Sequence, residues 1–314
     1  EWRSRNSGMQ RIMTNALPTM YPDSKYADCM PIGSLDVINN FPYQDIRDYY
    51  AKWYRPDLQG IMIVGDINVD EMEAKLKKVF ADVKAPVHPA NRIYYPVADN
   101  QEPLIFIGTD KEIETPSISF FFKSEAFPDS LKNTINYYGI QYMLSMGISM
   151  LNSRLAEIRQ QADPPFTGAS AGYGDFFVAK TKSAFGIDAS SKIGGIELAM
   201  KTILEEAERA RRFGFTETEY DRARANYLQR VESAYNEREK MKNDTYVNEY
   251  ISNFLDNEPM PGIEYEYAMM NKLAPNIPVT AINQVMQQLI TDNNQVVLLA
   301  GPEKEGLKYP TKEE

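Results

Sequence analysis

The sequence predicts an α+β protein of two domains, and three observations lead to that prediction. The chain has 314 residues, and one domain usually takes about 100–200. Short apolar runs rich in β-branched residues, typical of strands, occur among longer amphipathic segments typical of helices. A helix followed by an apolar run and a glycine occurs twice, ending at Gly65 and at Gly301, which indicates a duplicated domain.

The first block of the chain, residues 1–84, contains three predicted helices and one predicted strand. The helices are expected at 1–17, 43–54 and 68–84. Pro18 ends the first helix, and Asn68 caps the third. Residues 58–64 are predicted to be a buried strand because they are apolar and contain β-branched side chains. This strand should match 296–300 when the two domains are superposed, which would also bring the helices at 43–54 and 280–290 together.

The boundary between the blocks is expected within residues 85–112. Residues 85–103 carry four prolines and little periodicity, which predicts an extended linker, and the first strand of the following sheet begins just after it.

The second block, residues 113–314, is predicted to contain strands, among them a β-hairpin, and a longer series of helices before a final strand. One strand is expected just before this block, at 104–108. Within the block, strands are expected at 117–123, 166–177, 184–189 and 295–300. Helices are expected at 131–161, 193–213, 216–240, 241–256, 262–273 and 280–290. Gly214 ends one helix, and Thr216-Glu217-Thr218-Glu219 begins the next with capping-box spacing.

Composition excludes several classes of protein. The chain has 34 Lys and Arg against 44 Asp and Glu, a net charge of −10, which argues against a nucleic-acid-binding surface. No apolar run reaches the length of a membrane span of about 18 residues. The chain opens in mid-pattern at Glu1-Trp2-Arg3, so we expect it to be a piece of a longer protein.

The single histidine and the single cysteine limit the possible catalytic chemistry. A catalytic zinc site usually takes two or three imidazoles, so this chain alone does not supply one. His88 lies in the predicted linker, as Val87-His88-Pro89, and is interpreted as a solvated side chain without an orienting partner. Cys29 has no neighbouring base in the sequence and is interpreted as an inert buried thiol.

Three further patterns are assigned structural roles. Gly168, Gly172 and Gly174 do not have the spacing of a phosphate-binding loop, and we expect them to let another backbone approach the hairpin. The charged run between Glu205 and Arg212 indicates a solvated helix face. The 20 Tyr and 14 Phe predict either an aromatic core or a peptide-contacting surface, and the sequence leaves both open.

A series of short segments has the order and spacing of a known family. In the first block they are Glu1-Trp2-Arg3-Ser4-Arg5, Tyr21-Pro22, Met30-Pro31-Ile32-Gly33, Asp48-Tyr49-Tyr50, Trp53-Tyr54-Arg55-Pro56 and Ile63-Val64-Gly65-Asp66-Ile67. In the second they are Met150-Leu151-Asn152-Ser153-Arg154-Leu155, Pro164-Pro165-Phe166 and Gly301-Pro302. The series resembles the insulinase/pitrilysin family of zinc peptidases, which includes the mitochondrial processing peptidases, and is closest to its bacterial members.

The resemblance implies a fold and a division of the chain. The family fold is a duplicated α+β domain in which a mostly antiparallel sheet packs against helices. Residues 1–84 would be the C-terminal part of the catalytic-type domain, and residues 113–314 the second domain. Because the first domain would be truncated, we expect it to expose apolar surface, and therefore either to pair with another copy of the chain or to be partly disordered.

The resemblance also implies a chemistry that this chain lacks. The family binds zinc through H-x-x-E-H on a helix, whose histidines hold the ion while the glutamate polarises water. That motif is absent here, so either it lies upstream of Glu1 or the parent is a partner subunit without it. Glu1, ahead of Trp2-Arg3, matches the family's third zinc ligand in the complete protein. In this chain alone we expect Glu1 to be the exposed start of a frayed helix.

The implied function is that of a fragment of a zinc-dependent metalloendopeptidase, which by itself neither holds zinc tightly nor cleaves peptides. The alternative is a non-catalytic peptide-binding or scaffold subunit, and the sequence upstream of Glu1 would separate the two. Expected partners are a peptide or unfolded polypeptide, the remaining domains of the same protein, or a second copy. Analogy with bacterial relatives suggests the periplasm or cell envelope.

Overall fold

A five-stranded mixed sheet organises the second block in the computed structural model, which describes residues 6–28 and 33–314. The strands are β1 (Leu104–Asp110), β2 (Ser117–Glu125), β3 (Gly168–Phe176), β4 (Ala179–Ser190) and β5 (Gln295–Pro302). Their order in the sheet is β1-β5-β2-β4-β3. Only β1 and β5 run parallel, so the expected mostly antiparallel sheet is confirmed.

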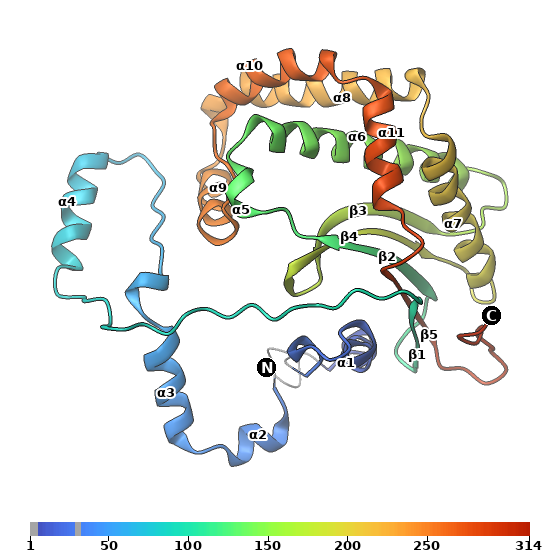
Figure 1. Cartoon of the computed structure of the whole chain (residues 1–314), viewed down its shortest axis with the longest axis horizontal. Coiled ribbons are helices and arrows are strands. Elements are labelled where there is room, and N and C mark those ends of the chain that lie inside the picture. Colours follow the sequence, from blue (N-terminus) through green and yellow to red (C-terminus); the bar gives the residue numbers. More distant parts are fainter. Residues whose placement is uncertain (1–5, 29–32) are drawn as a thin grey trace.

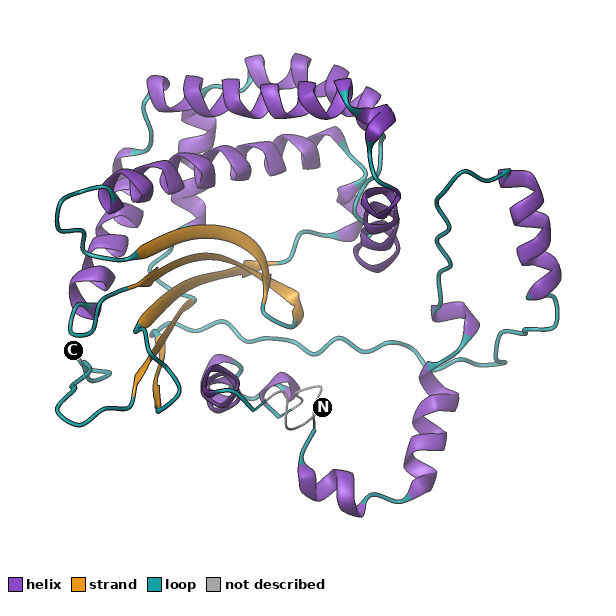
Figure 2. Ribbon diagram, turned by 180° about the vertical axis from the view of Figure 1, so that it is seen from behind, coloured by secondary structure: helices purple, strands orange, loops and turns teal. Residues whose placement is uncertain are grey.

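Helices lie on one side of this sheet, where α6 and α7 contact the strands and α8 and α10 form an outer layer above α6, as Figure 1 and Figure 2 show. They are α5 (Asp129–Lys132), α6 (Ile135–Arg159), α7 (Ile196–Phe213), α8 (Glu217–Asn236), α9 (Asn243–Asp256), α10 (Ile263–Leu273) and α11 (Val279–Leu289). Alternate side chains of β2 face them, so that Ile118, Phe120 and Phe122 enter the main core while their neighbours point to the other face.

Helix α1 (Gly8–Met20) packs on the opposite face, against β1 and β5. The side chain of Arg11 forms a bidentate pair with Asp110, with both N–O distances 2.8 Å. At the other end of the helix, the hydroxyl of Tyr21 donates to the carbonyl of Phe176 over 2.6 Å. The helix runs through Pro18, which was expected to end it, because Leu17 and Met20 continue its buried face.

Residues 35–94 stand away from the sheet and contain α2 (Leu35–Asn40), α3 (Tyr43–Trp53) and α4 (Val69–Val79) (Figure 1). No residue of these three helices is buried. Large apolar side chains such as Tyr43 and Ile46 are exposed along them, which confirms the expected exposure of apolar surface.

The predicted buried strand at 58–64 is wrong. These residues form the end of a short 3₁₀ turn (Pro56–Leu58) and then extended backbone without a strand partner among the described residues. A strand exists only when a neighbour takes its backbone hydrogen bonds, and an apolar sequence does not supply that neighbour. Because 58–64 is not a strand here, it cannot be superposed on the strand at 296–300, and the predicted match between the two domains is not seen in this structure.

Smaller differences concern where elements begin and end. The helix expected over 131–161 is divided, because Thr134 caps α6 by accepting a hydrogen bond from the backbone N–H of Tyr137 over 3.3 Å. Helix α4 ends at Val79 rather than near residue 84. Further 3₁₀ turns lie at Lys25–Ala27, Arg238–Lys240 and Ala274–Asn276.

The end of the linker is fixed to the sheet rather than free. The buried ammonium of Lys123 donates to the carbonyl of Ala98 over 2.6 Å, and burial lowers the pKa of Lys123 to about 8. Lys182 pairs with Asp99 over 2.8 Å. These two contacts fix the backbone at residues 98 and 99 beside β2 and β4, just before β1 begins.

Candidate functional site

The residues predicted to carry zinc chemistry do not form a metal site in the part of the chain that the structure describes. No group of three His, Cys, Asp or Glu suited to a metal ion occurs there. His88 is an exposed linker residue, as expected. Glu1 and Cys29 lie outside the described residues. Because the described side chains do not fit a zinc ion, no catalytic step is assigned to them.

One edge of the sheet has the features of a binding site instead. Within residues 6–28 and 33–314, strand β3 is the last strand on its side of the sheet and pairs with β4 alone. Its first seven residues are Gly168-Ala169-Ser170-Ala171-Gly172-Tyr173-Gly174, so small side chains dominate. A Cβ atom placed on any of these three glycines would meet no atom within 4 Å. No other part of the described chain fills this space, so the expectation that these glycines let another backbone approach stays a prediction.

The backbone of β3 presents hydrogen-bonding groups along this edge. Outward and inward residues alternate in an antiparallel strand, and Ala171 is outward because its N–H and C=O bond a side chain of α6 rather than β4. Ala169 and Tyr173 are outward by the same alternation. Among the described residues, nothing bonds the outward backbone groups of these two.

A groove runs beside this edge. A cavity of about 670 Å³ lies between α6 and β3, a volume in the range of ligand pockets. Its wall on α6 is mixed: Gln141, Ser145 and Ser149 recur every four residues on one face of that helix and form a polar row beside apolar Leu144 and Ile148. This polar spacing within an otherwise apolar helix was the signal in the sequence that could have revealed the groove.

A second cavity continues the groove past the end of β3. It has a volume of about 720 Å³ and shares Gln141 and Tyr173 with the first. On its wall, the hydroxyl of Tyr137 donates to Glu258 over 2.7 Å, and Lys132 lies 3.1 Å from the same carboxylate. Burial, followed by the bond to Glu258, raises the pKa of Tyr137.

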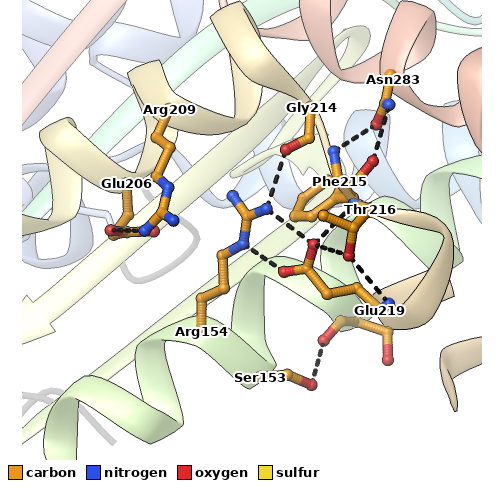
Figure 3. A network of polar contacts seen from close by, with 10 residues as sticks. Ser153, Arg154, Glu206, Arg209, Gly214, Phe215, Thr216, Glu219 and Asn283 are labelled. Carbon is orange, nitrogen blue, oxygen red and sulfur yellow. Dashed lines mark hydrogen bonds and ion pairs between the residues drawn. The ribbon is translucent and has the colours of Figure 1, made fainter.

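The side chain of Arg154 holds the far end of α6 in place (Figure 3). It binds Glu219 through two N–H groups, at 2.6 and 3.0 Å, and donates to the carbonyl of Gly214 over 2.9 Å. Burial alone would raise the pKa of Glu219, but the hydrogen bonds from Arg154 and Thr216 outweigh it and lower that pKa to about 2. The predicted capping box of Thr216 and Glu219 is confirmed.

Residues 150–155 form one of the segments on which the family resemblance rests. In the structure they have packing and hydrogen-bonding roles that their sequence alone does not show. Its apolar members Met150, Leu151 and Leu155 are buried in the main core. Arg154 joins α6 to the turn between α7 and α8, and Asn152 bonds the edge of β3. Of these residues, Asn152 lines the groove.

Comparison with known proteins places the fold and the family. Residues 40–227 match the family model described as the peptidase M16 inactive domain. A zinc protease PQQL-like protein of Arabidopsis thaliana is 28% identical over 298 residues, which is 95% of this chain and 28% of the relative. The chain thus spans less than a third of the length of the curated relatives it matches.

Solved structures share the fold. The periplasmic protease PqqL from Escherichia coli superposes with a TM-score of 0.84 and 21% identity, over 95% of this chain and 32% of that one. The ferredoxin protease FusC in complex with Arabidopsis ferredoxin superposes with a TM-score of 0.78 and 19% identity, over 99% of this chain and 34% of that one. At this level of identity the likeness concerns the fold alone. Within the described residues, no helix has the length and apolar character that a membrane crossing requires.

Proposed function

Because the chain belongs to the peptidase M16 family, in the part described as the inactive domain, we propose that it holds an extended polypeptide for a zinc peptidase and does not itself cleave one. The observation that carries this proposal is the open edge of β3 beside the groove on α6. The bound polypeptide would add to the sheet as a further strand.

Strand addition suits this edge for a physical reason. An incoming backbone pairs with outward N–H and C=O groups, and pairing of this kind depends little on the side chains of the ligand. Small residues along β3 leave room for that approach, because Gly168, Gly172 and Gly174 have open space where a side chain would be. The polar row of Gln141, Ser145 and Ser149 on α6 then faces the side chains of the ligand.

The proposal extends to the complete protein. Relatives are named zinc proteases, and one structural neighbour is titled a ferredoxin protease in complex with ferredoxin. We infer that the complete protein binds zinc through an H-x-x-E-H motif and through Glu1, and that residues 1–84 and 113–314 belong to successive domains with a boundary in 85–112. The periplasmic protease among the neighbours supports a periplasmic location.

The test is a binding measurement with a permanently unfolded protein. Fluorescein-labelled, reduced and carboxymethylated α-lactalbumin is titrated with the chain, and the anisotropy is followed. Substituting Ala169→Pro removes one outward N–H and should weaken binding at least several-fold, because strand addition loses a hydrogen bond and meets the proline ring.

The control is Lys312→Pro, in the exposed tail, which should bind as the unaltered chain does. Circular dichroism establishes that both variants fold. Equal binding by all three proteins would refute recognition at the β3 edge. Zinc-dependent cleavage of the labelled protein by this chain, abolished by a chelator, would refute the non-catalytic role.

A further inference from the structure

We propose that Asn152 competes with the bound polypeptide for β3 and so controls access to this edge. The inference rests on the proposed function, since it concerns the same strand edge. Its starting point is a pair of contacts in the middle of β3. The backbone N–H of Ala171 donates to Oδ1 of Asn152 over 2.7 Å, and Nδ2 of Asn152 donates to the carbonyl of Ala171 over 3.0 Å.

These two contacts have the pattern of a strand partner. A carboxamide has one acceptor and a donor group on the same carbon, and here both face one residue of β3. A neighbouring strand would offer Ala171 the same two bonds. The side chain of Asn152 therefore occupies the groups that an added strand needs at the centre of the edge, and full pairing requires it to move aside.

Ala171 lies between two other outward residues of β3, so its contact with Asn152 interrupts the edge in the middle. Ala169 and Tyr173, the outward residues on either side, have no such side-chain partner among the described residues. A polypeptide can therefore begin pairing at either of them, but a continuous ladder over all three requires the displacement of Asn152. From Ala169 to Tyr173 an extended ligand spans about 14 Å. The ligand class is thus an unfolded segment of at least five residues, without proline where its N–H must pair.

Asn152 is not needed to hold α6 against the sheet. Met150, Leu151 and Leu155 of the same helix are already fully buried in the core. Asn152 itself is only partly buried and lines the cavity of about 670 Å³, so a displaced amide can turn into the groove and bond water. The two bonds of Asn152 therefore add little to the packing of α6, and their effect falls on the edge of β3.

The test compares Asn152→Ala with the unaltered chain in the same anisotropy titration of labelled, carboxymethylated α-lactalbumin. Removal of the competitor should tighten binding about tenfold, because the ligand no longer has to replace two existing hydrogen bonds. Asn271→Ala is the matched control, since Asn271 is exposed on α10 and its side chain bonds, among the described residues, the carbonyl of Tyr267 in its own helix. It should bind as the unaltered chain does.

Amide hydrogen exchange reports on the contact itself. In the unaltered chain the N–H of Ala171 should exchange slowly. In Asn152→Ala it should exchange rapidly until the labelled protein is added, and then slowly again. Asn152→Asp keeps an acceptor for this N–H but loses the donor to the carbonyl, so its affinity should lie between the other two. This variant keeps the test decisive if Asn152→Ala does not fold.

The outcomes separate the two proposals. If the unaltered chain binds, Ala169→Pro weakens binding, and Asn152→Ala binds equally or more weakly, then the competition is refuted while edge recognition stands. If Ala169→Pro has no effect in either background, edge recognition itself is refuted. If Asn152→Ala forms dimers in sedimentation velocity and does not bind the labelled protein more tightly, Asn152 guards against self-pairing and the proposed competition is overturned.

Discussion

Residues 35–94 and the sheet domain that follows form helices equally readily but differ in what those helices contact. Helix α7 buries Ile196, Ala199 and Ile203 against the sheet, whereas α3 buries none of its residues. Both helices have an apolar stripe and both end where the sequence indicated. Local pattern is therefore enough to predict where a helix lies in this chain, but burial and strand formation depend on a partner surface.

The largest expected difference between the two regions concerns apolar truncation. Phe185 of β4 is fully buried in the main core and its ring lies 6.0 Å from that of Phe122. Phe185→Ala should lower the free energy of unfolding by about 3–5 kcal/mol, through lost burial and the cavity left behind. Ile46→Ala, on exposed α3, should change it by less than about 0.5 kcal/mol.

Urea unfolding followed by near-ultraviolet circular dichroism measures both. Ile46 is 58% exposed, so a loss comparable to that of Phe185→Ala would mean that α3 packs into the core in solution. That result would remove the distinction between the two regions.

A smaller effect is expected from the ion pair between α6 and α8. Arg154→Ala leaves the carboxylate of Glu219, whose side chain is 18% exposed, without its cation and should lower the free energy of unfolding by about 3 kcal/mol at neutral pH. The pKa of Glu219 is lowered in the folded protein to about 2, below its unfolded value. The ionised pair therefore stabilises the fold above about pH 4.5, and that contribution is lost as the pH falls towards 2.

The pH dependence distinguishes this pair from an exposed one. The stability of Arg154→Ala should fall less steeply than that of the unaltered chain between pH 5 and pH 2, in urea titrations at each pH. Arg212→Ala, which breaks an exposed pair with Glu208 on α7, is the control and should follow the unaltered chain. Parallel curves for Arg154→Ala and the unaltered chain would contradict the depressed pKa of Glu219.

The same contrast explains which features the sequence could predict. The helix at 43–54, the capping box at Thr216 and the hairpin of β3 and β4 follow from neighbouring residues, and each was predicted. The strand at 58–64 was wrong because pairing is not a local property.

The binding groove was missed for a related reason. The contact between Asn152 and Ala171 joins residues 19 apart, and that between Tyr137 and Glu258 joins residues 121 apart. No spacing rule in one sequence connects such pairs. The glycines of β3 stand out in the sequence, but only the strand order places them at an open edge of the sheet.

The smallest expected change in stability comes from removing an N-terminal helix cap. The same kind of cap occurs once in each of the two regions. Asn68 accepts a hydrogen bond from the N–H of Glu71 at the start of α4, and Thr216 accepts one from Glu219 at the start of α8. Loss of such a cap destabilises its helix by about 1 kcal/mol. In Thr216→Ala this loss should appear in the global unfolding free energy, because α8 buries Tyr220, Ala223 and Val231 and unfolds with the core.

In Asn68→Ala the loss should remain local. Helix α4 has no buried residue through which its destabilisation would reach the sheet, so the main urea transition should not move. Amide exchange over 69–79 should instead become about fivefold faster, the factor that corresponds to about 1 kcal/mol. A shift of the main transition in Asn68→Ala equal to that in Thr216→Ala would mean that α4 and the core unfold together, and that the exposed segment is energetically part of the sheet domain.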